Sequence, residues 1–141
     1  MIYPAHFEPA EEGGYVVTFS GLPGATQGDT LEEAERAAVD CLVTVLASYA
    51  KRSMDFPAAA APKPGECLVF VPSLDQAKLA LIRRMAELKV SNVELAKRLG
   101  CSEGAVRRLV NLNHESKLSK IEAALAGLGK RLSVHVDELS H

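Results

Sequence analysis

The sequence predicts an α+β protein with two units: a β-β-β-α-β unit over residues 1–72 and an all-helical unit ending in a strand over residues 73–141. Segments rich in β-branched and aromatic residues, which favour strands, lie near the start of the chain. Apolar residues recur every three or four positions over residues 31–49 and again beyond residue 74, which is helical spacing. The alanine- and proline-rich stretch 58–65 separates the two patterns.

The first unit begins with a predicted β-hairpin. Residues 2–7 and 15–19 have strand-forming compositions, and they flank the polar, glycine-containing turn of residues 11–14. Residues 20–28 contain three glycines and Pro23. This composition predicts a loop or a distorted edge strand.

A long helix and a last strand complete the first unit. Thr30 and Glu33 have the spacing of a capping box, in which a hydroxyl and a carboxylate satisfy free amides at a helix start. The apolar spacing continues to about Lys51, and residues 66–71 form a predicted strand that Pro72 ends. A unit this small buries little apolar surface, so we expect it to need a partner surface.

The second unit consists of short predicted helices. Ser73 and Gln76 have the spacing of another capping box. Residues 131–136 alternate polar and apolar side chains, which predicts a half-buried C-terminal strand. The further helices are expected over residues 92–99, 103–112 and 120–128, with Gly129 as a natural stop.

Residues 92–109 have the pattern of a helix-turn-helix. Ala96 is small where two helices must cross closely, and Gly100 stands just past the first helix, where a left-handed residue permits the turn. Ser91 can cap the first helix and Ser102 the second, and Val106 can pack back onto the first. The second helix of such a pair lies in the DNA major groove.

Exposed polar side chains around this pair predict DNA contacts. Arg107 and Arg108 can bond bidentately to guanine or to phosphate, and Glu103 can accept from cytosine. The alternative is a helical hairpin with a solvated basic face and no DNA contact, which leaves the basic excess of this unit unexplained. The candidate DNA-binding residues are Asn92, Lys97, Ser102, Glu103, Gly104, Arg107, Arg108 and Lys117.

The charges divide between the two units. Residues 1–72 hold ten acidic and four basic side chains, a net charge of −6, and residues 73–141 hold eight acidic and twelve basic ones, a net charge of +4. Chance segregation of solvated charges is one explanation. The other is two modules with different partners, a basic protein for the first and nucleic acid for the second.

Several classes of protein are excluded by composition. The sequence has no apolar run of about 18 residues, the length needed to span a bilayer, and its start lacks a signal-peptide pattern. The three cysteines are scattered, which fits a reducing cytoplasm, and the four histidines have no ligand spacing. We therefore expect a cytoplasmic protein with no membrane association, no metal, no cofactor and no catalytic residue.

Three segments in fixed order resemble the HicB family of antitoxins: Glu12 to Val17 (EGGYVV), Leu22 to Thr30 (LPGATQGDT), and Glu32-Glu33-Ala34. A helix-turn-helix like the one described above occurs in one branch of that family. The resemblance implies a partial RNase H-like fold for residues 1–72, without the acidic cluster of an RNase H metal site. That domain would bind and block a HicA-type toxin, a small basic ribonuclease that cleaves mRNA.

The same resemblance implies that residues 73–141 bind the operator of the paired genes at inverted half-sites and so repress them. A terminal strand with an open edge is a template for pairing, so we expect two copies to associate there as a dimer or tetramer. The rival is that this strand returns to the first unit's sheet. The candidate toxin contacts are Glu32, Glu33, Arg36 and Asp40, and the candidate dimerisation residues are Leu132, Val134 and Val136.

Two other functions remain open at this point. A ligand-sensing helix-turn-helix repressor would hold a small molecule in an apolar pocket of its first unit. A nuclease would bind divalent metal ions at clustered carboxylates.

Overall fold

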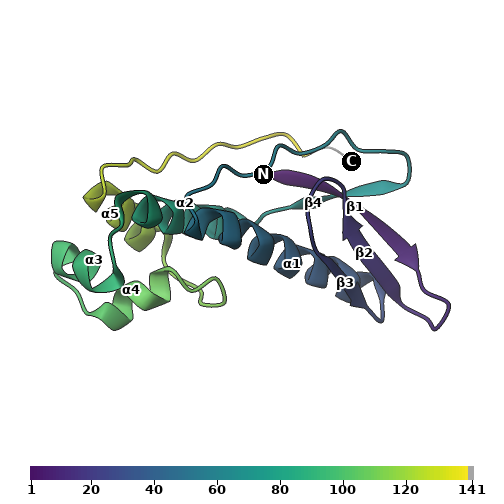
Figure 1. The fold of residues 1–141 in the computed structure, drawn as a ribbon, viewed down its shortest axis with the longest axis horizontal. Coiled ribbons are helices and arrows are strands. Elements are labelled where there is room, and N and C mark those ends of the chain that lie inside the picture. Colours follow the sequence, from purple (N-terminus) through teal and green to yellow (C-terminus); the bar gives the residue numbers. More distant parts are fainter. Residues whose placement is uncertain (140–141) are drawn as a thin grey trace.

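The computed structural model describes residues 1–139 and consists of a four-stranded sheet, a long helix packed on it, and a group of shorter helices (Figure 1). The predicted α+β class is therefore confirmed. The strands are β1 (Ile2–Pro9), β2 (Tyr15–Phe19), β3 (Ala25–Gly28) and β4 (Glu66–Phe70), and the helices are α1 (Leu31–Lys51), α2 (Ser73–Leu88), α3 (Asn92–Leu99), α4 (Glu103–Leu109) and α5 (Leu118–Gly127).

The sheet has the strand order β3-β2-β1-β4, and every neighbouring pair is antiparallel. The predicted hairpin forms β1 and β2, with Ala5 opposite Phe19 and Pro9 opposite Tyr15. The glycine-rich segment after β2 forms β3 at the sheet edge, as predicted. The chain then crosses the sheet through α1, so that β4 pairs with the far side of β1.

Helix α1 begins at the predicted cap. The Thr30 hydroxyl accepts a hydrogen bond from the Glu33 amide at 3.1 Å, and the Glu33 carboxylate accepts one from the Asp29 amide at 3.1 Å. Its inner face then packs on one face of the sheet, because small and branched side chains repeat at helical spacing. The buried residues of this interface include Tyr3, Ala5, Val17 and Phe19 from the sheet and Ala38, Leu42 and Leu46 from α1.

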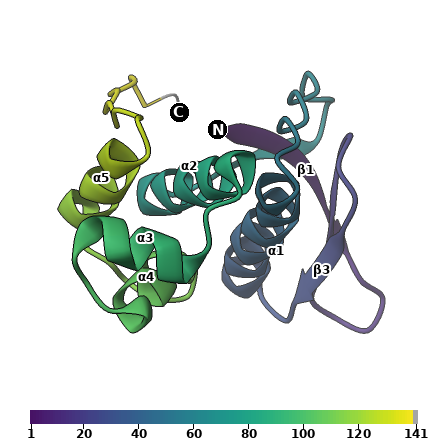
Figure 2. The ribbon, with the colours of Figure 1, turned by 60° about the vertical axis from the view of Figure 1, so that its left-hand side comes forward.

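Helix α2 is buried on two sides (Figure 2). Leu79 and Ile82 belong to the core between α1 and the sheet, whereas Leu81 and Met85 belong to the core of the shorter helices. We expected the first unit to need a partner surface, and α2 of the same chain supplies part of one.

Three local predictions in the second half were wrong in detail. Helix α2 has Pro72 as its N-cap without a side-chain cap, since Gln76 donates instead to the Val71 carbonyl at 2.9 Å. Helix α4 ends at Leu109, three residues earlier than predicted, and α5 begins two residues earlier, at Leu118. Each boundary depends on contacts with other elements, which sequence spacing does not contain.

The predicted C-terminal strand is absent. Residues 131–136 form no β-ladder; Leu132 packs against the helical core, while Val134 and Val136 are 75% and 86% exposed. A strand exists only where its amides and carbonyls pair with a neighbouring strand. Residues 131–136 do alternate polar and apolar side chains, but no strand within residues 1–139 pairs with them.

Gly28 allows β3 to approach the start of α1. A Cβ at this position would lie 2.3 Å from the Ala34 amide nitrogen and 2.7 Å from its Cα. We expect Gly28→Ala to lower the free energy of unfolding by about 1–3 kcal/mol, because backbone must move to relieve the overlap. Chemical denaturation measures the effect, with exposed Gln27→Ala on the same strand as the control. An unchanged midpoint for Gly28→Ala would contradict this close approach.

Candidate functional site

The predicted turn between two short helices lies at residues 100–102, between α3 and α4. Gly100 ends α3 with φ 69° and ψ 33°, a left-handed conformation that glycine adopts without strain. The Ser91 hydroxyl accepts from the Glu94 amide at 3.2 Å, and the Ser102 hydroxyl accepts from the Ala105 amide at 3.1 Å. Both predicted caps are therefore present, and they fix where each helix starts.

The two helices pack on each other and on α5. Ala96 is buried where α3 meets α4, as its size predicts, and Leu95 and Val106 are fully buried beside it. Ile121 and Leu125 of α5 complete this core. The opposite side of α4 remains open to solvent.

The predicted DNA-binding residues fall into two groups. Arg108 and Lys117 line one groove of about 360 Å³ between α4, the following loop and α5. Arg107 and Asn92 line a second groove of about 570 Å³ between α4 and α1. Lys120 also lines the first groove, which the sequence does not indicate, because this position depends on how α5 packs beside α4.

The remaining DNA-binding candidates have local roles or exposed positions. Ser102 is the cap of α4, and Glu103 pairs with the Arg107 guanidinium at 2.9 Å across one helical turn. Both partners are exposed, so this pair is weak and Arg107 can exchange it for a phosphate or a base. Lys97 is exposed on α3, and Gly104 leaves room beside the Arg108 side chain.

The four predicted toxin contacts are all exposed on α1. Glu32, Arg36 and Asp40 are spaced four residues apart, which places them in one row along the helix. Glu33 lies beside this row and caps the helix. Asp40 lines the same groove as Arg107, so the fold brings this row, with a carboxylate on either side of Arg36, close to the basic end of α4.

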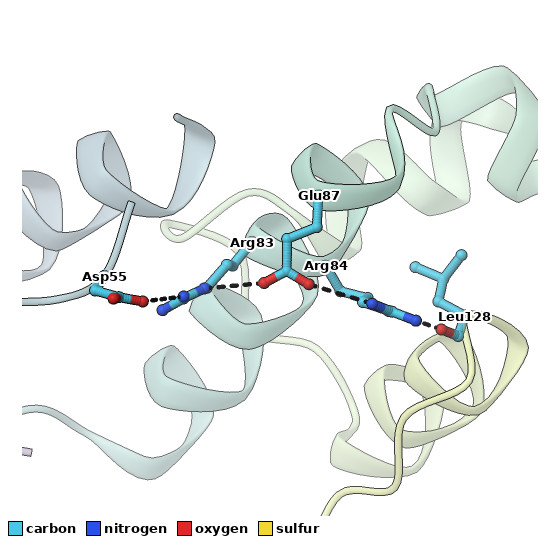
Figure 3. A network of polar contacts seen from close by, with 5 residues as sticks. All are labelled: Asp55, Arg83, Arg84, Glu87 and Leu128. Carbon is cyan, nitrogen blue, oxygen red and sulfur yellow. Dashed lines mark hydrogen bonds and ion pairs between the residues drawn. The ribbon is translucent and has the colours of Figure 1, made fainter. Parts of the chain in front are cut away.

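Cationic side chains of α2 hold the other helices in place. Arg83 bonds to Asp55 after α1 and to Glu87, and Arg84 joins Glu87 to the Leu128 carbonyl at the end of α5 (Figure 3). Hydrogen bonds from Arg83 and Arg84 lower the pKa of the Glu87 carboxyl, so Glu87 remains charged as the pH falls.

Lys78 on α2 is a further residue that the sequence did not single out. It is fully buried, and its ammonium group donates to backbone carbonyls of Arg108, Asn111 and His114. Burial lowers the pKa of this ammonium group. The sequence around Lys78 does not indicate that this side chain is buried, because its acceptors lie 30 to 36 residues further along the chain.

Two searches of the described residues bear on other classes of function. Within residues 1–139, no three His, Cys, Asp or Glu side chains gather in a way that could hold a metal ion. None of the helices in this range has the length and hydropathy needed to cross a membrane.

Comparison with known proteins identifies the family. A family model described as a HicB-like antitoxin of a bacterial toxin–antitoxin system matches residues 2–80, which cover the sheet, α1 and the first half of α2. The chain belongs to the HicB-like antitoxin family. The predicted resemblance to this family is thereby confirmed, and the protein is an antitoxin of a toxin–antitoxin system.

The similarity to HicB antitoxins extends through the shorter helices. Antitoxin HicB of Escherichia coli (strain K12) is 35% identical over 135 residues, covering 95% of this chain and 98% of the relative. Antitoxin HicB 2 of Photorhabdus laumondii is 39% identical over 135 residues, covering 95% of each. Antitoxin HicB 1 of the same species is 34% identical over 139 residues, covering 97% of this chain and 88% of the relative.

Proposed function

We propose that this antitoxin neutralises a HicA-type ribonuclease through its sheet unit and represses its own operon through α4, both in the cytoplasm. The observation that carries the DNA-binding half is the capped α3–α4 pair, joined at left-handed Gly100, on a unit of net charge +4. Such a pair presents its second helix to the major groove. Arg107 and Arg108 project from that helix into solvent.

The carboxylates of the α1 row support the toxin-binding half. A ribonuclease needs positive surface to approach RNA phosphates, and an acidic partner can cover that surface and associate rapidly. The sheet unit has a net charge of −6, and Glu32 and Asp40 are exposed on the helix that covers its core.

Self-association is the third part of the proposal, and it serves operator binding. One recognition helix buries too little surface for tight specific binding, so helix-turn-helix proteins pair across inverted half-sites. Val134 and Val136 are exposed apolar residues on a segment that pairs with no strand within residues 1–139. We propose that the corresponding segments of two copies pair there, with Leu132 anchoring each segment to its helical core.

The ligand-sensing alternative has weaker support. It predicts an enclosed apolar pocket within the sheet unit. The groove of about 570 Å³ instead lies between α1 and α4, with Asp40 and Arg107 at its surface. Its position suits contact with a macromolecule better than enclosure of a small molecule.

The first prediction concerns the operator. We expect Arg107→Ala and Arg108→Ala each to weaken operator binding by about 1–3 kcal/mol where the side chain contacts a base, and binding to fall steeply with salt. Fluorescence anisotropy with the duplex upstream of the gene measures both effects. Arg131→Ala removes the same charge from the same unit and serves as the control. Undiminished affinity in the Arg107/Arg108 double variant contradicts the assignment.

The second prediction concerns the toxin. Reversing two charges of the α1 row, in the Glu32→Lys/Asp40→Lys variant, is expected to weaken toxin binding by about tenfold or more, mainly through slower association. The matched control is Glu11→Lys/Glu12→Lys, which makes the same charge change at the β1–β2 turn of the same unit. Surface plasmon resonance and growth rescue provide the measurements. Equal loss in both variants would show that overall charge, and not the α1 row, is responsible.

The third prediction concerns assembly. Val134→Lys/Val136→Lys places two charges on the apolar side of the terminal segment and leaves Leu132 in place. We expect a lower mass in light scattering and weaker operator binding, because like charges prevent apolar pairing. Ser133→Lys/His135→Lys places the same side chains on the other side of the segment and is the control. A first variant that keeps the mass of the unsubstituted protein rules out pairing through these valines.

A further inference from the structure

Lys78 is buried without an acidic ion-pair partner in direct contact. No atom of this residue is exposed to solvent, and the ion pairs within residues 1–139 do not include it. A buried ammonium group is costly unless its donors are satisfied. Its three N–H donors meet three backbone carbonyls, at 3.1 Å for Arg108, 2.7 Å for Asn111 and a short contact for His114.

These carbonyls belong to one short segment of chain. Arg108 lies in the last turn of α4, and Asn111 and His114 lie in the loop that follows it. A positive charge at the C-terminal end of a helix satisfies unpaired carbonyls and complements the helix dipole. The loop folds around the ammonium group, with the His114 amide bonded to the Asn111 carbonyl at 3.1 Å.

The segment held by Lys78 carries candidate DNA contacts. The Arg108 backbone is bonded directly, and Lys117 follows the loop immediately at the start of α5. The side chains of Arg108 and Lys117 line one groove on the outer surface. Helix α4 has only seven residues, too few to be stable by itself, so its direction depends on such tertiary contacts.

Lys78 is also fixed from the other side. Its neighbour Leu79 packs in the core shared with α1, and Ala77 packs in the helical core. The ammonium group therefore joins a helix anchored in both cores to the end of α4. We propose that Lys78 is a positioning residue, which holds the Arg108–Lys117 segment in the arrangement that recognises the operator. This proposal rests on the proposed operator binding.

The structure supplies a matched control on the same helix. Arg84 also donates to a helix-terminal carbonyl, that of Leu128 at 2.8 Å, but this carbonyl ends α5, far along the chain from Arg108. Arg84→Met and Lys78→Met each remove one α2 cation and its carbonyl contacts. Arg84→Met shows how a loss of stability in the helical unit affects DNA binding. Lys78→Met causes such a loss and also releases the end of α4.

The experiment compares full-length proteins on two duplexes, one with the sequence upstream of this gene and one with the same bases scrambled. We expect Lys78→Met to weaken binding to the upstream duplex by about tenfold or more and to change binding to the scrambled duplex by less than about twofold, because the surface cations remain. Arg84→Met is expected to leave the ratio of the two affinities unchanged. Circular dichroism confirms that each variant is folded.

Other outcomes overturn the proposal. If Lys78→Met keeps the ratio of the two affinities, either with both unchanged or with both lowered equally, then Lys78 contributes at most to the stability of the fold. That result contradicts a positioning role. If Lys78→Met does not fold, Lys78→Gln retains two donors for three carbonyls and is expected to lower the ratio by a smaller factor; an unchanged ratio contradicts the proposal. An unsubstituted protein without preference for the upstream duplex refutes operator binding itself, whereas a preference that Lys78→Met retains refutes only the role of Lys78.

Discussion

The structure depends on one helix that must be buried on two sides. Helix α2 places Leu79 and Ile82 against α1 and the sheet, and Leu81 and Met85 against the shorter helices. Neither core is complete without it, since a small unit gains too little from its own apolar area. Polar side chains of α2 also connect the elements, because Lys78 and Arg84 donate hydrogen bonds to carbonyls at the ends of α4 and α5. The two units thus differ in net charge and in candidate partners, but the packing of α2 joins them.

This joint core places the two candidate surfaces on one body. The row of Glu32, Arg36 and Asp40 lies on the exposed side of α1, whose buried side packs on the sheet and on α2. Helix α4 lies across a groove from it, and Asp40 and Arg107 line the two sides. A surface charge acts on its surroundings over about 8–10 Å at physiological ionic strength. The opposite charges on the two sides of this groove therefore contribute to the electrostatic field at both candidate surfaces.

Features fixed by a few neighbouring residues could be predicted from the sequence. The Thr30, Ser91 and Ser102 caps and the left-handed Gly100 were predicted because each depends on backbone groups within three or four residues. Features that depend on distant partners could not. The buried position of Lys78 requires carbonyls some 30 residues later, and the two-sided burial of α2 requires two cores. The prediction of a C-terminal strand was wrong for the same reason. Alternating side chains indicate which face of a strand is apolar, but they do not specify a neighbouring strand to pair with.

Hydrogen exchange of the intact chain in increasing denaturant shows whether α2 makes the two units one cooperative body. The probes are the backbone amides of fully buried residues: Val17 in the sheet, and Leu95 and Ile121 in the helical core. We expect one shared free energy of opening and one denaturant dependence for both groups, because neither core survives the loss of α2. Helical-core amides that open at much lower free energy, while the sheet amides keep their full protection, would contradict it.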